Sequence, residues 1–224
     1  MRERLRENLD RVIWNIEKAR VEVSEHHIVK LVAVGKYTTS ENIKLLYELG
    51  QRAFGENQVQ QLANRVKELS SLPIEWHMIG TLQTNKINRL IELKPYLLQS
   101  LSSLKLAEAL NSRLERKGAT MNALLQINSS NEKSKSGVQP DEAIDIYQEI
   151  RERYPNINLR GVMTIGALSN NREIVQQSFE TTHTIYDRLR RDGAEICSMG
   201  MSGDYELAIK CGSNLVRIGS KIFR

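Results

Sequence analysis

Segments of helical periodicity alternate with short β-rich segments along almost the whole chain, and this alternation limits the possible folds most strongly. Residues 2–23 carry apolar side chains at three- and four-residue steps, which predicts an amphipathic helix with its apolar stripe at Leu5, Leu9, Val12, Ile13, Ile16 and Val23. The run 28–34 is apolar and rich in β-branched residues, typical of a strand buried on both faces.

The same pattern then repeats to the end of the chain. Further strands are predicted over 52–55, 74–79, 96–100, 121–127, 158–165, 195–199 and 214–218. Helices are predicted between them over 40–49, 58–69, 84–92, 103–117, 140–153, 172–191 and 204–211, with Pro140 near a first turn and glycines after several ends.

Strands that alternate with helices through short connections form βαβ units, and this number of strands favours a closed (β/α)8 TIM-like barrel. An open doubly wound sheet is the alternative. Because only residues 219–224 follow the last strand, we expect no helix after it. The extra N-terminal helix would then cover that part of the ring, and residues 1–224 would form a single domain.

Composition excludes several classes of protein. Hydrophobic residues make up 40% of the chain, enough for a sizeable core. No apolar run is long enough to span a membrane and the first 25 residues are too charged for a signal peptide, so we expect a cytoplasmic protein without membrane contact. Cys197 and Cys211 form no disulfide or metal-binding pattern, which favours a reducing compartment.

The net charge of +5, from 32 basic and 27 acidic residues, is diffuse. Aromatic residues do not interleave with the cations, so nucleic-acid binding is not expected, whereas a small anionic ligand suits this charge.

In a barrel of this kind, functional groups gather at the carboxyl ends of the strands. Lys36 ends the segment LVAVGK, so it is predicted at the barrel mouth, either as a solvated lysine or as an amine that forms a Schiff base. Thr38 and Glu41 are candidates for a capping box of the next helix. Asn57, in FGEN, either caps the following helix or offers its amide to a ligand.

Two other features of the sequence, the histidines and a long polar run, are not assigned to a ligand-binding site. His77 in WHMIG has no partner at metal-ligand spacing, and the remaining histidines form no metal motif, so we predict a packed histidine and no metal site. The polar run 128–137 is interpreted as a mobile loop or, alternatively, as a lid or partner surface.

The last two connections carry the strongest local signal. Residues 200–204, Gly-Met-Ser-Gly-Asp, lead from a strand into a helix and would expose backbone N–H groups beside the Ser202 hydroxyl. Residues 216–220, Val-Arg-Ile-Gly-Ser, add a second small-residue loop with Arg217. Barrels often bind phosphate with the loops after strands seven and eight, although Ser202 or Asp204 as an N-cap and Arg217 in a surface ion pair are the alternatives.

Six ordered motifs resemble the pyridoxal-phosphate homeostasis protein family over nearly the whole chain: LVAVGK, FGEN, WHMIGTLQTNK, EKSKSG, GVMTI and the pair SMGMSGDYELAI with VRIGSKIF. Two departures are Gly35, where the family often has serine or threonine, and the absence of a proline near Gly166. The resemblance implies the barrel shared with the N-terminal domain of alanine racemases.

The resemblance also implies a site for pyridoxal 5'-phosphate. It assigns a Schiff base to Lys36, phosphate contacts to Ser202, Gly203, Gly219 and Ser220, a cofactor contact to Asn57 and the pyridine nitrogen to Arg217. A guanidinium at that nitrogen disfavours its protonation, which makes the ring a poor electron sink.

The function implied is vitamin B6 and amino-acid/keto-acid homeostasis without a catalysed reaction, by a monomer that hands the cofactor to pyridoxal-phosphate-dependent apoenzymes. The alternative is an amino-acid racemase or decarboxylase. Alanine racemases take a second base from a tyrosine of another domain, for which residues after Gly219 leave no room, so Tyr37 or Tyr205 would have to substitute. An interaction module based on loop 128–137 is a third class.

Overall fold

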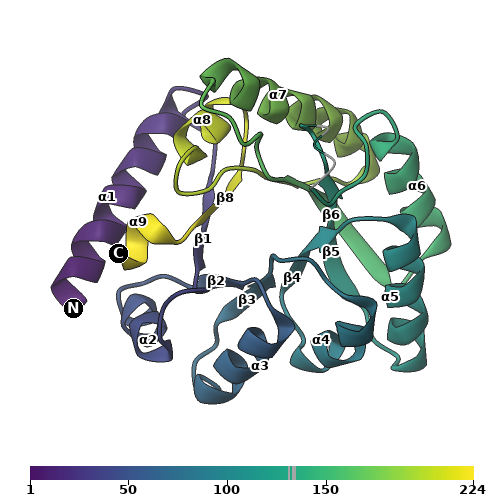
Figure 1. Cartoon of the computed structure of the whole chain (residues 1–224), viewed down its shortest axis with the longest axis horizontal. Coiled ribbons are helices and arrows are strands. Elements are labelled where there is room, and N and C mark those ends of the chain that lie inside the picture. Colours follow the sequence, from purple (N-terminus) through teal and green to yellow (C-terminus); the bar gives the residue numbers. More distant parts are fainter. Residues whose placement is uncertain (131, 133–134) are drawn as a thin grey trace.

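The computed structural model describes residues 1–130, 132 and 135–224, whose strands form one closed parallel barrel (Figure 1). Each strand pairs with the next in sequence, and β1 pairs with β8, Lys30 lying opposite Leu215 and Ala33 opposite Ile218. The predicted (β/α)8 barrel is therefore confirmed and the open sheet is wrong. The strands are β1 (Lys30–Val34), β2 (Ala53–Glu56), β3 (Glu75–Met78), β4 (Leu97–Leu101), β5 (Met121–Ile127), β6 (Ile157–Thr164), β7 (Ile196–Ser198) and β8 (Leu215–Ile218).

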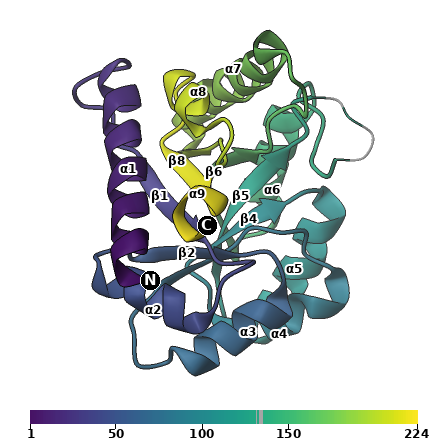
Figure 2. The same cartoon turned by 60° about the vertical axis from the view of Figure 1, so that its left-hand side comes forward.

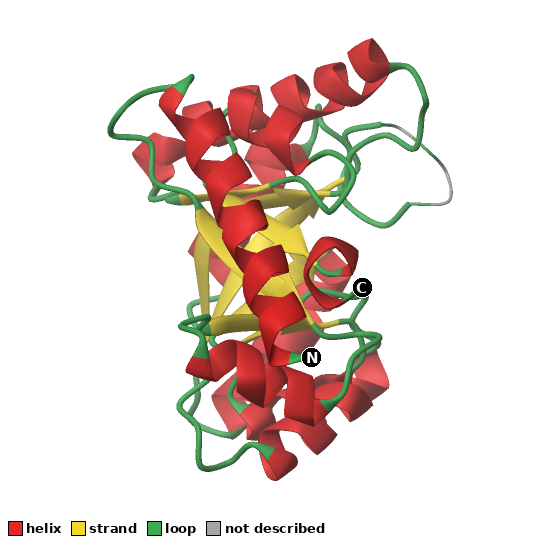
Figure 3. Cartoon of the chain, turned by 90° about the vertical axis from the view of Figure 1, so that its left-hand side faces the viewer, coloured by secondary structure: helices red, strands yellow, loops and turns green. Residues whose placement is uncertain are grey.

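Helices surround these strands on the outside (Figure 3). They are α1 (Arg2–Val21), α2 (Ser40–Glu48), α3 (Val59–Glu68), α4 (Ile87–Leu93) after the short 3₁₀ turn η1 (Thr84–Lys86), α5 (Leu104–Arg116), α6 (Ala143–Arg153), α7 (Arg172–Leu189) with η2 (Arg190–Asp192), α8 (Tyr205–Lys210) and α9 (Ser220–Phe223). In the described part of the chain, no helix is both long and apolar enough to cross a bilayer.

The long helix α1 packs with a narrower apolar stripe than predicted. Its buried residues are Leu5, Leu9, Val12, Ile16 and Ala19, at the spacing expected of one helix face. Ile13 and Val23 are exposed, because Ile13 points away from this stripe and Val23 lies beyond the end of the helix. The prediction was wrong for these two residues.

Other elements also differ from the predictions. Strand β1 begins at Lys30, and Ile28 is exposed in the loop before it, so the apolar run was not all strand. Helix α6 begins at Ala143, three residues after Pro140. Residues 220–223 form the single turn α9, where no helix was expected, because the buried side chain of Ile222 anchors this turn against α1.

The core has two parts. The larger part fills the space between the barrel and its helices. Inside the barrel, Val32, Ala53 and Leu215 pack together at one place, and Leu97, Leu124 and Met163 at another. Because side chains alternate along a strand, these inward residues show which positions of each strand face the barrel interior.

Helices α1 and α9 lie side by side, and both termini are on this side of the molecule (Figure 2). The Asn8 Nδ2 group donates to the backbone oxygens of Ile222 at 3.1 Å and Arg224 at 2.9 Å. The N-terminal helix thus covers the ring next to β8, as predicted, and also holds the last turn of the chain in position.

Candidate functional site

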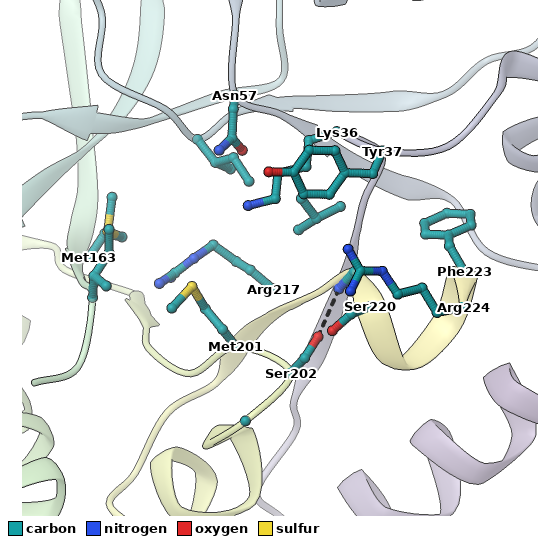
Figure 4. A pocket seen from close by; sticks show the side chains of 15 residues that line it. Lys36, Tyr37, Asn57, Met163, Met201, Ser202, Arg217, Ser220, Phe223 and Arg224 are labelled. Carbon is teal, nitrogen blue, oxygen red and sulfur yellow. Dashed lines mark hydrogen bonds between the residues drawn. The ribbon is translucent and has the colours of Figure 1, made fainter. Parts of the chain in front are cut away.

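A pocket of about 440 Å³ opens at the carboxyl ends of the strands (Figure 4). This volume suits a small organic ligand. All seven residues predicted to bind a ligand line this pocket: Lys36, Asn57, Ser202, Gly203, Arg217, Gly219 and Ser220. The structure therefore brings together residues that are up to 184 positions apart in sequence (Lys36 and Ser220).

Strand alternation explains why these side chains meet. Val32 faces the barrel interior, so Val34 and Lys36, two and four residues later, point the same way and line the pocket. Leu215 is likewise an interior residue, and Arg217 and Gly219 follow it at the same spacing. The inward faces of β1 and β8 therefore continue into the pocket.

Lys36 is exposed and extends into the pocket beside the Tyr37 ring, 4.8 Å from its Nζ atom to the ring centroid (Figure 4). Its loop is held by Arg65 of α3. The guanidinium donates to the Thr38 backbone oxygen and to the Ser40 hydroxyl at 2.6 Å. These contacts fix the connection that carries the lysine.

The cap of the next helix is Thr39 rather than the predicted Thr38. The Thr39 hydroxyl accepts a hydrogen bond from the Asn42 backbone N–H at 3.2 Å. Thr38 instead accepts from the Asn42 side chain at 3.0 Å. The capping box was therefore wrong by one residue, because Thr39 has the extended backbone of an N-cap.

A buried carboxylate accounts for the glycine before the lysine. A Cβ atom at Gly35 would lie 2.6 Å from Glu56 Oε1, which is closer than real contacts. Glu56 is fully buried; burial raises the pKa of its carboxyl, and Arg65, with its Nε 3.4 Å from Oε1, opposes this rise. Gly35 thus leaves room for an ion pair beneath the lysine loop.

Asn57 does not cap helix α3, whose N-cap is Gln58 without a side-chain bond. The Asn57 side chain points into the pocket instead (Figure 4). Its backbone is packed closely against Gly80, since a Cβ there would lie 2.1 Å from the Asn57 oxygen. The glycine of WHMIG therefore permits the approach of two strand ends beside Asn57.

The two small-residue loops at 200–204 and 216–220 form one cradle. The Ser202 hydroxyl accepts a hydrogen bond from the Gly219 N–H at 3.2 Å, the dashed line in Figure 4. The Asp204 carboxylate folds back to accept from the Met201 N–H at 2.6 Å, so Asp204 is the N-cap residue of α8 but makes no forward capping bond.

Within the described residues, the N–H groups of Ser202, Gly203 and Ser220 donate to no protein acceptor. With the Ser202 and Ser220 hydroxyls they present several neutral donors toward the pocket. This donor set suits a phosphate group, whose oxygens accept hydrogen bonds from backbone N–H groups and hydroxyls.

Arg217 is buried in the barrel, not in a surface ion pair. Its guanidinium donates to the Thr164 backbone oxygen at 2.7 Å and to the Ser198 hydroxyl. Burial lowers its pKa to about 10, although Asp204 opposes this fall. The side chain therefore remains a cation at neutral pH.

The pocket is strongly cationic. Lys36, Arg217 and Arg224 line it, and no aspartate or glutamate is found among its described lining residues. Sequence reasoning missed Arg224 and Phe223, which form a wall of the pocket from α9 (Figure 4). The signal that could have found them is Ile222, an apolar residue that needs a buried contact after the last strand.

The remaining candidates lie outside this pocket. His77 is fully buried between Glu75 and Gln99, as predicted. Tyr205 does not line the pocket, because its hydroxyl accepts from Asn15 of α1 at 3.1 Å. Among the described residues, no cluster of three or more histidine, cysteine or acidic side chains is arranged for a metal ion, and both cysteines are free.

Residues 131, 133 and 134 of the predicted loop 128–137 lie outside the described residues, so the lid and partner-surface interpretations stay predictions. The described part of this loop contacts the connection after β6. Lys135 Nζ donates to the Gly166 oxygen at 2.8 Å, and Glu132 accepts from the Leu168 N–H at 3.2 Å.

Comparison with known proteins identifies the class of this barrel. The family "Alanine racemase, N-terminal domain" matches residues 8–224. A crystal structure of an unknown protein from Bifidobacterium adolescentis is 32% identical, with a TM-score of 0.91 over 99% of this chain and 95% of that one. This barrel and its mouth pocket therefore define a protein of the alanine racemase N-terminal domain class.

Two further relatives identify the family within this class. The pyridoxal phosphate homeostasis protein of Helicobacter pylori is 52% identical over 219 residues, 98% of both chains. PipY of Synechococcus elongatus, solved with pyridoxal phosphate bound, is 28% identical with a TM-score of 0.79 over 93% of this chain and 100% of that one. The chain belongs to the pyridoxal phosphate homeostasis protein family.

Proposed function

We propose that this chain binds pyridoxal 5'-phosphate as a Schiff base on Lys36 and serves vitamin B6 and amino-acid/keto-acid homeostasis without a catalysed reaction of its own. The observation that supports this most directly is the pocket itself. One cavity combines a lysine amine, two guanidinium groups and two loops with neutral N–H and O–H donors. A phosphorylated aldehyde is a ligand with matching groups.

Each part of the pocket suits one part of that cofactor. Ser202, Gly203, Gly219 and Ser220 would hold the phosphate, and Arg217 would face the pyridine nitrogen, with Asn57 beside the ring. When bound, the cofactor would supply an aldehyde that condenses reversibly with an amine and releases water. The PipY structure with bound cofactor and the family name of the relatives support the assignment.

The position of Arg217 supports a storage role over catalysis. A buried guanidinium that stays charged at neutral pH repels a proton on a neighbouring ring nitrogen. An unprotonated ring withdraws electrons weakly, which slows chemistry at the α-carbon of an amino acid. Arg217 therefore favours reversible holding of the aldehyde.

We further propose a cytoplasmic monomer that hands the cofactor to pyridoxal-phosphate-dependent apoenzymes. Lys36 and Tyr37 are exposed at the mouth, so a second amine has access to the lysine. Reactivation of a purified apoenzyme by the loaded protein, faster than by the same concentration of free cofactor, would support direct hand-over. Equal rates would contradict it.

The proposal is tested by the visible absorption of the purified protein with added pyridoxal phosphate, before and after borohydride reduction. The natural chain is expected to show a Schiff-base band, and reduction should leave the cofactor covalently attached to the peptide that contains Lys36. Lys36→Ala should lose both signals, whereas Lys44→Ala, exposed on α2 and outside the pocket, should keep them. Free-aldehyde spectra for the natural chain and Lys36→Ala alike would overturn the proposal.

A racemase or decarboxylase remains the second candidate, because Tyr37 lines the pocket next to Lys36 and offers a hydroxyl as a second acid or base. Incubation of loaded protein with amino acids in deuterium oxide separates the candidates. A carrier leaves both the α-hydrogen and the carboxylate in place. A racemase exchanges the α-hydrogen for deuterium, whereas a decarboxylase releases carbon dioxide and puts a deuterium in its place on the α-carbon. Tyr37→Phe should then lower the rate of whichever reaction occurs.

A further inference from the structure

A chain of hydrogen-bonded side chains crosses the interior of the barrel and ends at Arg217. The Arg217 guanidinium donates to the Ser198 hydroxyl, and Ser198 donates to Gln99 Oε1 at 2.7 Å. Gln99 Nε2 lies 2.9 Å from His77 Nδ1, and His77 Nε2 lies 2.8 Å from Glu75 Oε1. The chain thus connects strands β8, β7, β4 and β3.

All members of this hydrogen-bonded chain except Glu75, which is partly exposed, are shielded from solvent. His77, Gln99 and Ser198 have no exposed surface, and Arg217 is 4% exposed. Buried polar groups without partners are costly, so each of these groups must find its partner within the barrel. A polar layer of this kind therefore allows few arrangements of its hydrogen bonds.

The carboxylate of Glu75 sets the direction of every bond. A carboxylate only accepts, so His77 Nε2 must carry a hydrogen, and the neutral ring then has a bare Nδ1. Gln99 must present its NH₂ group to that nitrogen and its oxygen to Ser198. The Ser198 hydroxyl therefore donates to Gln99 and keeps its lone pairs for Arg217, so all donors point toward Glu75.

We propose that His77, Gln99 and Ser198 are positioning residues. They connect the Glu75 carboxylate to Arg217 through hydrogen bonds of one fixed direction, and so fix the orientation of the Arg217 guanidinium in the pocket. Thr164 holds the other branch of the guanidinium, and together the two contacts leave one arrangement for Arg217. The effect of this orientation on a bound pyridine nitrogen rests on the proposed function. The series of hydrogen bonds from Glu75 to Arg217 rests only on the geometry of the barrel.

Protonation of His77 would conflict with this arrangement. A second ring proton occupies Nδ1, so the Gln99 amide has to turn, and the Ser198 hydroxyl loses its acceptor. Lys30, bound to the same Glu75 oxygen, and the Tyr96 ring at 5.6 Å are the other charged or titratable groups next to His77. Burial lowers the pKa of His77, while Glu75 opposes this effect, which agrees with a neutral ring.

The substitution Glu75→Gln tests the direction of the chain, and Lys30→Gln is its matched control. Both variants remove the same ion pair at the far end of the barrel. Only Glu75→Gln also replaces the carboxylate, which can only accept, with an amide that can donate to His77 Nε2, so the histidine tautomer is no longer fixed. Ring ¹⁵N NMR of His77 in protein without cofactor should show the Nε2–H tautomer in the natural chain and in Lys30→Gln. Glu75→Gln should shift His77 toward the Nδ1–H tautomer.

The effect on the pocket is measured by titration with pyridoxal phosphate. Glu75→Gln and Gln99→Met should weaken binding about three- to tenfold, as expected for the loss of one buried hydrogen bond in the series that ends at Arg217, and should change the pH profile of the absorption band. Lys30→Gln should leave binding unchanged. So should Ser100→Ala, since Ser100 is buried beside Gln99 but donates to the Gly80 oxygen outside the chain.

Three results would overturn the inference: an unchanged His77 tautomer in Glu75→Gln, equal losses of affinity in Glu75→Gln and Lys30→Gln, or full affinity in a folded Gln99→Met. Thermal melts establish that each variant is folded. If the natural protein bound no pyridoxal phosphate, the proposed function would fail. The tautomer measurement would still test the hydrogen bonds between Glu75 and Arg217.

Discussion

At the scale of single residues, charge is the feature that distinguishes this pocket. Lys36 and Arg224 lie 4.8 Å and 5.9 Å from the same Tyr37 ring, and Arg217 lies deeper in the barrel. No acidic side chain from the described lining residues balances them. An anionic ligand would therefore gain attraction from all three, and each cation contributes according to its distance from the ligand charge.

Arg224 is expected to select for the phosphorylated form of the vitamin, because the Ser202 and Ser220 loops themselves offer only neutral donors. Arg224→Gln should weaken pyridoxal phosphate binding about tenfold, the usual size of one charge-assisted hydrogen bond, and should leave pyridoxal binding unchanged. Spectral titration with both aldehydes measures this difference.

The matched control for Arg224 is Lys221→Gln. Lys221 lies on the same turn α9, but its amine is 3.7 Å from Glu206 and outside the pocket. Equal losses in the two variants, or an equal loss for both aldehydes in Arg224→Gln, would contradict a specific role in phosphate binding.

At the scale of elements, α1 replaces a full helix after β8 as the cover of the ring. It packs along α8 and α9 and holds the last turn through Asn8. That turn forms a wall of the pocket, so the first helix supports the site although it contributes no lining residue. The contribution of α1 to stability depends on the single row of buried residues along one face of the helix.

Leu9 and Ile13 test this stripe within one helix. Leu9 is 3% exposed and Ile13 is 44% exposed. Leu9→Ala should lower the free energy of unfolding by about 2–4 kcal/mol, since it leaves a cavity against the barrel, whereas Ile13→Ala should change it by less than about 0.5 kcal/mol. Urea unfolding of the two variants gives both values, and similar losses would show that α1 packs on another face.

At the scale of the whole molecule, buried ionisable groups link stability to pH. Burial lowers the pKa of His77 and His183 below the ordinary value of 6.5, so the unfolded chain binds protons first as the pH falls. Glu56 and Asp204 act in the opposite direction, because burial raises the pKa of these carboxyls and favours proton uptake by the folded chain. The net dependence is the sum of both effects.

The contribution of His77 is therefore measured as a difference between two chains. The natural chain should lose stability relative to His77→Gln as the pH falls from 7.5 to below the unfolded histidine value near 6.5. Urea unfolding at a series of pH values gives the difference, which should be constant above that range. A difference that does not vary with pH would show that burial does not exclude the proton from His77.

Local patterns in the sequence predicted most of the fold, because periodicity and turn residues depend on nearest neighbours along the chain. The alternation of helices and strands indicated the barrel, and the Gly-Ser loops and Lys36 indicated its mouth. Boundaries such as Ile28 and Pro140 were wrong, since an apolar run or a proline does not by itself decide where hydrogen bonding between strands or within a helix begins.

The sequence by itself determined the βα period, the inward alternation that carries Lys36 and Arg217 to one end, and the residue types of the loops 200–204 and 216–220. Only the tertiary structure decided that Gly35 leaves room for Glu56, that Arg224 enters the pocket from α9, and that Gln99 meets Ser198 across the barrel. Gly35 follows β1 and Glu56 ends the neighbouring strand β2, but their close approach depends on how the side chains pack. The other two contacts join segments far apart in sequence. They form only because β1 pairs with β8 and closes the ring, and no local pattern in the sequence specifies this pairing.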